Sequence, residues 1–257
     1  MSINGPEELA GMRAAGAIVC LMLSAMKSAV RPGITTGELD EVGAGVMTQH
    51  GARSAPALVY KFPGVNCISV NEEAVHGIPG KRTLAAGDLV KLDVTIEKAG
   101  FMADAAVTVP VGEVTEERQQ LIECAERAFA KAMLVARDGF RVSEIGRAVE
   151  REVRRSGFSV IRELGGHGIG RTIHEEPRVP NYPDPEANQI LEEGLVITVE
   201  PIIAAGSGRS FVAPDKWTVV TADHRPSAHY EHTLVITKGV PILLTAAYPR
   251  NAQFDRA

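Results

Sequence analysis

The sequence contains few aromatic residues and few cysteines. Aromatic side chains make up 5% of its 257 residues. The core must therefore be built mainly from Val, Ile, Leu and Ala. The three cysteines, Cys20, Cys67 and Cys124, form an odd, scattered set without CxxC spacing. This pattern argues against a disulfide framework and favours a reducing cytoplasm.

A charge bias and a targeting segment are also missing. The chain has 27 Lys and Arg against 32 Asp and Glu, a formal net charge of −5, and the two signs are interleaved. Because no basic stripe indicates a nucleic-acid surface, we expect no DNA partner. The N-terminal stretch lacks the pattern of a secretory signal, and no long uncharged apolar run predicts a membrane span. We therefore expect a cytoplasmic protein without membrane contact.

Linkers and low-complexity segments are absent, and the length suits one large α/β domain with a substantial core. We therefore predict a single domain over residues 1–257. Thr35 and Glu38 have the spacing of a capping box, in which each satisfies a backbone N–H of the other at a helix start. The pattern predicts helices at residues 6–30, 35–49, 115–137 and 143–156, short strands and turns at 57–111, strands after 158, and an irregular stretch at 176–189.

Five oxygen or nitrogen side chains stand out against this background, each in a short apolar or glycine-rich segment. They are Asp93, Asp104, His167, Glu200 and Glu231. Carboxylates are depleted from strand interiors, and burying one without a partner is costly. A single such acid is most simply a strand end, a bulge or a salt-bridge partner. Four of them together indicate a shared compensating charge, which a pair of divalent cations would supply.

The surroundings of His167 strengthen this interpretation. Glycines flank it in the segment 165–170, and their missing side chains would let the backbone approach a bound object closely. His174 follows seven residues later. Carboxylates with one imidazole form an oxygen-rich site suited to Mn, Fe, Co or Zn in open coordination.

Three pairs of segments in the two halves of the chain resemble each other. Residues 87–93 and 194–200 both place a glycine six positions before an acid. Asp104 and Glu231 each precede a glycine by eight positions. The segments starting at Arg31 and Arg137 both contain, at the same distances from the Arg, a Glu followed by an apolar residue and then a Gly. We interpret these echoes as an old duplication, with a second half that begins near residue 115 and both halves placing acids at a common centre.

The chain resembles the bacterial-type (type I) methionine aminopeptidases of the pita-bread metallopeptidase family over residues 6–244. The motifs that carry the resemblance are Ser69-Val70-Asn71-Glu72, His76-Gly77-Ile78-Pro79, the Asp93/Asp104 pair, the glycine-flanked His167 with His174, Thr198-Val199-Glu200-Pro201, Lys216-Trp217-Thr218-Val219 and Tyr230-Glu231-His232-Thr233. The resemblance implies an α+β pita-bread fold: two pseudo-symmetric αβ halves, a curved, mainly antiparallel central sheet, and helices on its outer face.

The implied activity is removal of the N-terminal methionine from nascent proteins and peptides whose second residue is small. Two divalent metal ions (Co, Mn, Fe or Zn) would activate a water molecule that attacks the first peptide bond. The partners would be the N-termini of nascent polypeptides, with a transient ribosome contact, and the enzyme would act as a monomer in the cytoplasm.

The resemblance also implies roles for individual residues. Asp93 would bind one ion, His167 and Glu200 the other, and Asp104 and Glu231 would bridge them. Glu200 would also be the general base. His174 would stabilise the oxyanion of the tetrahedral intermediate, and His76 would contact the peptide near the scissile bond. Without the resemblance, His76 would be interpreted as a surface histidine in a turn.

An apolar slot for the unbranched methionine side chain is implied as well. Its wall would include Phe62, Cys67, His76 and Trp217, although Trp217 alone could be an ordinary core aromatic. The chain departs from the family at Val59 and Ile173, where relatives often have aromatic rings, and at Leu164, where Met or an aromatic is usual. We expect these apolar replacements to reshape the slot and alter fine specificity without abolishing the reaction.

Two other functions remain open at this stage. One is an Xaa-Pro-directed peptidase of the same fold, although those relatives commonly carry an extra N-terminal domain that 257 residues are too few to hold. The other is a non-catalytic binding protein that kept the fold. Such a protein would be expected to have lost ligands, and all five are present.

Overall fold

The computed structural model describes residues 1–246 and contains five helices and fifteen strands within that range. The helices are α1 (Pro6–Ala29), α2 (Thr36–Gln49), α3 (Ala55–Tyr60), α4 (Glu116–Met133) and α5 (Val142–Arg155). The strands of the first half are β1 (Arg53–Ser54), β2 (Cys67–Val70), β3 (Glu73–Val75), β4 (Leu89–Lys98) and β5 (Phe101–Pro110). Those that follow α5 are β6 (Ser159–Val160), β7 (Gly165–Gly168), β8 (Glu175–Pro180), β9 (Val196–Val199), β10 (Ile202–Ala204), β11 (Ser210–Val212), β12 (Val219–Thr221), β13 (Ser227–His229), β14 (Glu231–Val235) and β15 (Ile242–Leu243).

The central sheet has the strand order β1-β4-β5-β14-β9-β7-β8, with β2 added to β4 and β15 to β14. All its pairings are antiparallel. Two small sheets, β13-β10-β6 and β11-β12-β3, complete the strand content of the described residues. Because β5 pairs with β14, strands from the two halves of the chain meet at the middle of the sheet.

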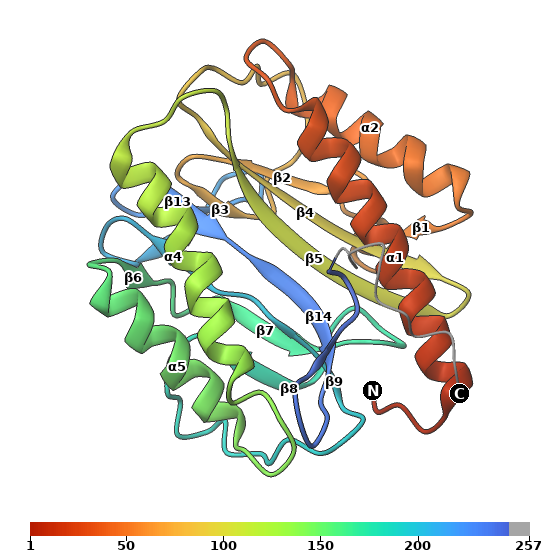
Figure 1. Cartoon of the computed structure of the whole chain (residues 1–257). Helices are drawn as coiled ribbons and strands as arrows, with labels where there is room; N and C mark the ends of the chain where they lie inside the picture. Colours follow the sequence, from red (N-terminus) through yellow and green to blue (C-terminus); the bar gives the residue numbers. More distant parts are fainter. Residues whose placement is uncertain (247–257) are drawn as a thin grey trace.

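Two helix pairs lie on the same side of the central sheet, α1 with α2 over β4 and β5, and α4 with α5 over the strands of the second half (Figure 1). Each pair buries its own apolar cluster. Met22 and Leu39 pack with Val94 in the first half, whereas Leu121 and Ile145 pack with Val199 in the second. The predicted layer arrangement of a mainly antiparallel sheet with helices on one face is thus present.

The start of α2 follows the sequence signal. The hydroxyl of Thr35 accepts a hydrogen bond from the Glu38 backbone N–H at 3.1 Å, and the Glu38 carboxylate accepts one from the Thr35 N–H at 2.8 Å. The capping box is confirmed.

By length and composition, α1 could cross a membrane, a property that the sequence analysis did not assign to it. Its apolar side, which includes Met12, Val19, Met22 and Met26, is instead buried. The helix packs on α2, β4 and β5. Its hydropathy is therefore explained by core packing.

Three expected boundaries were wrong. Residues Ala55–Tyr60 form helix α3 where strands and turns were expected, because Ser54 caps the Ala57 N–H and Pro56 occupies the first turn. The expected irregular stretch begins instead with β8, which pairs with β7. Helix α4 ends at Met133, four residues before the expected end, and the chain then turns through Gly139, whose φ of +84° favours glycine.

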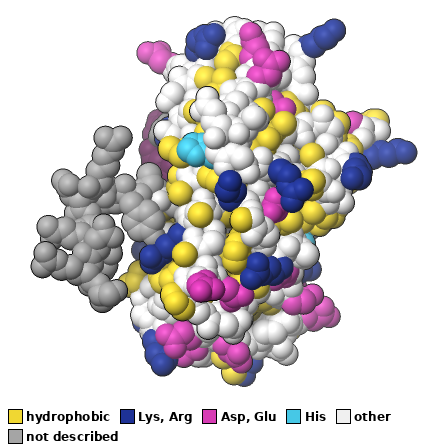
Figure 2. All heavy atoms as spheres, turned by 90° about the vertical axis from the view of Figure 1, so that its right-hand side faces the viewer, with side chains coloured by type: hydrophobic (Ala, Val, Ile, Leu, Met, Phe, Trp, Pro, Cys, Tyr) yellow, Lys and Arg dark blue, Asp and Glu magenta, His cyan; other side chains and the backbone are white. Residues whose placement is uncertain are grey.

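Positive and negative side chains are interspersed on the face shown in Figure 2, without an area of one sign. This distribution matches the interleaved charges of the sequence.

The close approach of α5 to β8 generates a stability prediction. A Cβ on Gly146 would collide with the backbone carbonyls of Pro180 and Tyr182, whereas one on Gly45 in α2 would meet nothing within 4 Å. Gly146→Ala should therefore destabilise the protein by about 1–3 kcal/mol through overpacking. Gly45→Ala should stabilise it by about 0.5–1 kcal/mol, because alanine has the higher helix propensity. Urea unfolding of both variants measures the difference, and equal effects at the two positions would contradict it.

Candidate metal centre

The residues that the sequence singled out line one cavity beside the central sheet. Its lining includes the five candidate ligands and the five other predicted residues: Asp93, Asp104, His167, Glu200, Glu231, Phe62, Cys67, His76, His174 and Trp217. The cavity volume is about 240 Å³. Since small-molecule sites usually start at about 300 Å³, a cavity of this volume suits a single side chain and small ions.

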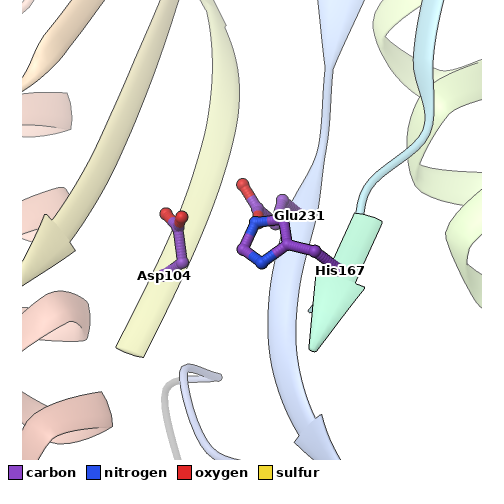
Figure 3. A group of neighbouring side chains, drawn as sticks. All are labelled: Asp104, His167 and Glu231. Carbon is purple, nitrogen blue, oxygen red and sulfur yellow. The ribbon is translucent and has the colours of Figure 1, made fainter. Parts of the chain in front are cut away.

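Five neighbouring strands of the sheet each contribute one candidate ligand. Asp93 lies in β4, Asp104 in β5, Glu231 at the start of β14, Glu200 directly after β9, and His167 in β7. Figure 3 shows Asp104, His167 and Glu231 extending toward one another from three of these strands. Strand order therefore converts residues spread over 139 positions of sequence into one cluster.

Two buried threonines hold these ligands in place. The Thr233 hydroxyl accepts a hydrogen bond from the Asp104 N–H at 2.9 Å and donates one to the Asp104 carbonyl at 2.8 Å. The Thr198 hydroxyl accepts from the His167 N–H at 3.1 Å and donates to Glu200 Oε1 at 2.9 Å. Both threonines are buried. Each of them connects strands and orients a candidate ligand at the same time.

The glycines around His167 have a different role from the one expected. A Cβ on Gly166 would overlap the backbone carbonyl of Thr198, and a Cβ on Gly168 would overlap that of Glu176. Neighbouring strands, rather than a bound object, thus occupy the space that these glycines leave. They allow β7 to lie close between β8 and β9, which brings His167 to Glu200.

The four carboxylates lie close together, with Asp93 partly buried and the other three buried, and their removal from water dominates their electrostatics. Burial raises the pKa of Glu200 to about 8 and that of Asp104 to about 7. It raises the pKa values of Asp93 and Glu231 well above their usual range, and the neighbouring carboxylates raise them further. Four full negative charges cannot coexist here without nearby positive charge.

Carboxylate oxygens without a hydrogen-bond partner also indicate that the cluster needs a positive charge. Asp104 Oδ1 and Glu231 Oε1 are buried without a hydrogen-bond partner among the described residues. Asp104, His167 and Glu231 each offer a ligand atom, and these atoms lie within 4.8 Å of one another. Asp93 lies outside this tight group but close enough to Asp104 for the charge of Asp104 to raise its pKa. A divalent cation fits this donor set, because it would give the unpartnered oxygens a partner and balance their charge.

The state of His167 also suits a metal ligand. Its Nδ1 lies 2.9 Å from the carbonyl oxygen of Gly168. A carbonyl can only accept, so Nδ1 carries the proton and Nε2 presents a lone pair. That Nε2 lies 3.6 Å from Glu200 Oε1. Burial lowers the pKa of His167 to about 3, so the imidazole is neutral. Metal-binding histidines usually donate their other N–H in this way.

An apolar wall adjoins the cluster. The rings of Phe62 and Trp217 meet edge to face with centroids 5.2 Å apart, and Cys67 pairs with Asp93 across β2 and β4. Of the positions expected to depart from the family pattern, Leu164 and Ile173 line the cavity. Val59 is not part of the lining and is 42% exposed, so its replacement does not shape this wall directly.

Two histidines stand at the exposed rim. His76 occupies a left-handed backbone conformation, with φ of +58°, which also fits the turn suggested by the sequence alone. His174 packs its ring on His167, with centroids 4.2 Å apart. Its Nδ1 lies 2.5 Å from the hydroxyl of Tyr60.

Sequence reasoning missed Tyr60 and His229, which also line the cavity. Tyr60 lies at the end of α3, a helix that the sequence analysis did not expect. His229 stands two positions before Glu231 in a run of buried residues, and that proximity was an available signal. Both are brought to the site by contacts between segments distant in sequence.

The raised pKa values of Asp104 and Glu200 predict how the stability of the metal-free protein depends on pH. Unfolded carboxyls titrate near about pH 4. Between about pH 5 and pH 8, the folded protein therefore holds protons that the unfolded chain has released, and its stability should fall as pH rises. A saturating divalent cation displaces these protons and should flatten the dependence.

Urea unfolding in EDTA and in excess Mn²⁺, across this pH range, provides the measurement. Asp104→Asn should reduce the slope in EDTA, because its side chain does not titrate. Stability in EDTA that stayed constant from about pH 5 to about pH 8 would contradict the assignment of these pKa shifts.

Comparison with known proteins gives the same fold. A crystal structure of methionine aminopeptidase from Rickettsia prowazekii superposes with a TM-score of 0.91 at 36% identity, covering 96% of this chain and 100% of that chain. The prolidase from Pyrococcus horikoshii OT3 superposes with a TM-score of 0.77 at 22% identity, covering 96% of this chain and 64% of that chain. The latter likeness extends to the fold alone.

Comparison of sequences also identifies the family of the chain. "Methionine aminopeptidase 2" of Bacillus subtilis (strain 168) is 45% identical over 247 residues, covering 95% of this chain and 99% of that protein. The model of metallopeptidase family M24 matches residues 10–238. The predicted α+β pita-bread fold is confirmed, and the chain is a hydrolase that depends on divalent metal ions. It belongs to metallopeptidase family M24.

Proposed function

We propose that the protein is a methionine aminopeptidase, which removes the N-terminal methionine of nascent proteins and peptides when the second residue is small. The observation that carries this proposal is the composition of the cavity. Its lining combines a cluster of carboxylates and imidazoles with the apolar ring pair of Phe62 and Trp217. Relatives that match nearly the full chain carry that name.

The centre is proposed to hold two divalent ions. Asp93 would hold one, His167 and Glu200 would hold the other, and Asp104 and Glu231 would contribute to both. Two overlapping groups of ligand atoms that share Glu231 support a bridging position for this residue. The repulsion between Asp93 and Asp104, which raises the pKa of Asp93, supports their placement around a common centre.

When bound, divalent ions lower the pKa of a water molecule and polarise the scissile carbonyl. Glu200 accepts the proton of the attacking water as general base. Its carboxylate is oriented for this by the hydrogen bond from Thr198 to Oε1. The free amine of the substrate lies beside the carboxylate cluster, whose negative charge attracts it.

His174 stabilises the oxyanion of the tetrahedral intermediate. If the Tyr60 hydroxyl donates its hydrogen bond to Nδ1, the proton of the imidazole is on Nε2 and available to the oxyanion. His76 contacts the peptide around the scissile bond from the exposed rim. Both histidines therefore act where the second residue of the substrate would pass, which favours small side chains there.

The methionine side chain enters the slot formed by Phe62, Cys67, His76 and Trp217. Leu164 and Ile173 complete its lining. An unbranched thioether is flexible and suits a narrow apolar slot, whereas a β-branched side chain would meet the T-shaped ring pair.

The proposal also covers the domain organisation of the protein and the place where it acts in the cell. Residues 1–257 form a single catalytic domain that arose by duplication, with its second half beginning near residue 115. The separate helix pairs over the two halves of the sheet support this interpretation. The protein works as a monomer in the cytoplasm on the N-termini of nascent polypeptides, in transient contact with the ribosome.

The assignment of Glu200 predicts a large and specific loss of turnover. Glu200→Gln keeps the size of the side chain but removes the carboxylate charge, so turnover should fall by about 10²–10⁴-fold, the usual contribution of a general base. Glu163→Gln is the matched control, because Glu163 also lines the cavity but lies outside the proposed ligand set. Metal content measured in parallel separates weaker metal binding from loss of the base. Turnover near the unaltered rate in metal-loaded Glu200→Gln would place the base elsewhere.

The proposed slot predicts substrate selection. The unaltered protein should cleave Met-Ala-Ser peptides in preference to Leu-Ala-Ser peptides. Trp217→Ala should reduce this discrimination by about 1–3 kcal/mol, the range typical of apolar pockets, whereas Trp217→Phe should keep most of it. Steady-state kinetics on a peptide panel measures the effect. Preference of the unaltered protein for Xaa-Pro bonds with any first residue would replace this proposal with a proline-directed peptidase.

A further inference from the structure

His229 is the one cavity-lining histidine for which the proposed mechanism has no role. It ends β13 and pairs with Ile202 of β10. Its backbone N–H donates to the Thr108 hydroxyl at 2.8 Å, and that hydroxyl donates back to the His229 carbonyl at 2.9 Å. The residue is 2% exposed. Its position is therefore determined by two strands and a threonine, as with Asp104 and His167.

The ring of His229 faces the carboxylate cluster. Its Nε2 lies 3.3 Å from Glu231 Oε2 and 3.7 Å from Glu200 Oε2. Neither ring nitrogen has a hydrogen-bond partner among the described residues. A buried polar group without a partner is costly. An imidazole held rigidly in this state indicates that a ligand, rather than a protein group, satisfies it.

The distances match those between ligands of one metal ion. Nitrogen and oxygen ligands lie about 2.0–2.2 Å from such an ion, which separates tetrahedral neighbours by about 3.4 Å. The pair proposed to bind one ion together, His167 Nε2 and Glu200 Oε1, is 3.6 Å apart. The distances from His229 Nε2 to Glu231 and Glu200 fall on either side of this value. Glu200, His229 and Glu231 also each offer an atom within 4.8 Å of the others.

We propose that His229 is a sixth metal ligand of this centre, binding through Nε2 to the ion that Glu200 and Glu231 also bind. Glu200 then lies between two imidazoles, with Oε1 toward His167 and Oε2 toward His229. The inference rests on the proposed metal centre but does not depend on the methionine specificity.

A second imidazole changes which metals the centre prefers. Carboxylate oxygens suit Mn²⁺, whereas imidazole nitrogen increases the preference for Zn²⁺, Ni²⁺ and Co²⁺. The centre should therefore discriminate more strongly between Zn²⁺ and Mn²⁺ than a centre with His167 alone.

Counting the bound imidazoles in the Co²⁺-loaded protein tests the proposal without any assay of peptide cleavage. Each histidine bound to Co²⁺ gives one strongly shifted, exchangeable N–H proton signal in the NMR spectrum. The unaltered protein should give two such signals. His229→Gln should give one, and His167→Gln should retain the signal of His229. One signal in the unaltered protein would overturn the proposal, whatever the variants do.

Metal affinity gives the second measurement. His229→Gln should weaken Zn²⁺ binding by about 10–100-fold or more, a loss at least as large as that from removing an outer partner of a ligand, and should weaken Mn²⁺ binding less. Titration calorimetry measures both. Equal losses for Zn²⁺ and Mn²⁺, or no loss, would mean that His229 only positions the carboxylates.

His232→Gln is the matched control. His232 is also a buried histidine of this region, but its two ring nitrogens face the Thr245 and Tyr230 hydroxyls, at 2.9 and 3.2 Å. It should keep two shifted signals and the same ratio of Zn²⁺ to Mn²⁺ affinity. Loss of a signal in this variant would contradict the assignment to His229. A failure of the methionine proposal would appear only in the peptide assays.

Discussion

Mutual repulsion among four clustered carboxylates, three of them buried, is the constraint on which the structure of this protein depends. Asp93, Asp104, Glu200 and Glu231 lie in the interior, where burial raises the pKa of each. Left without cations, they would be protonated or would destabilise the fold. A divalent cation reverses this situation, because the same density of acidic oxygens that is unfavourable alone becomes a strong binding site. The fold and the metal are therefore energetically coupled.

Holding such groups together requires a scaffold that cannot relax. The five candidate ligands lie on five consecutive strands, so backbone hydrogen bonds set their spacing. Three threonines strengthen the arrangement, since the hydroxyl of each makes two hydrogen bonds, at least one of which joins neighbouring strands. Thr233 holds Asp104, Thr198 connects His167 with Glu200, and Thr108 holds His229. These threonine hydrogen bonds at three points explain how a site built from distant segments can be preorganised.

Next to this rigid centre, the cavity is lined by apolar and more exposed side chains. The apolar wall and the exposed rim lie on segments outside the five ligand strands, such as α3 with Tyr60 and the turn before β12 with Trp217. Divergence in these segments can alter substrate choice while the centre stays the same. Two of the three positions expected to depart from the family, Leu164 and Ile173, line the cavity and lie outside the ligand strands.

How far the sequence could predict the protein depends on the kind of feature. The helices with clear caps and apolar spacing were predicted to within a few residues, because those signals are local. Helix α3 and strand β8 were missed, since a six-residue helix depends on one cap and β8 forms only against β7. The internal duplication stays a prediction, because similar spacings alone do not establish common descent.

The sequence by itself determined that several acids in apolar strands must share a compensating charge, because burying a carboxylate is costly in any fold. It also determined the family, through motifs that span nearly the whole chain. Only the tertiary structure decided that the glycines beside His167 serve strand packing, that Tyr60 meets His174, and that His229 faces Glu200 and Glu231. These facts depend on which backbone lies beside which side chain, and only the folded arrangement of separate segments sets that.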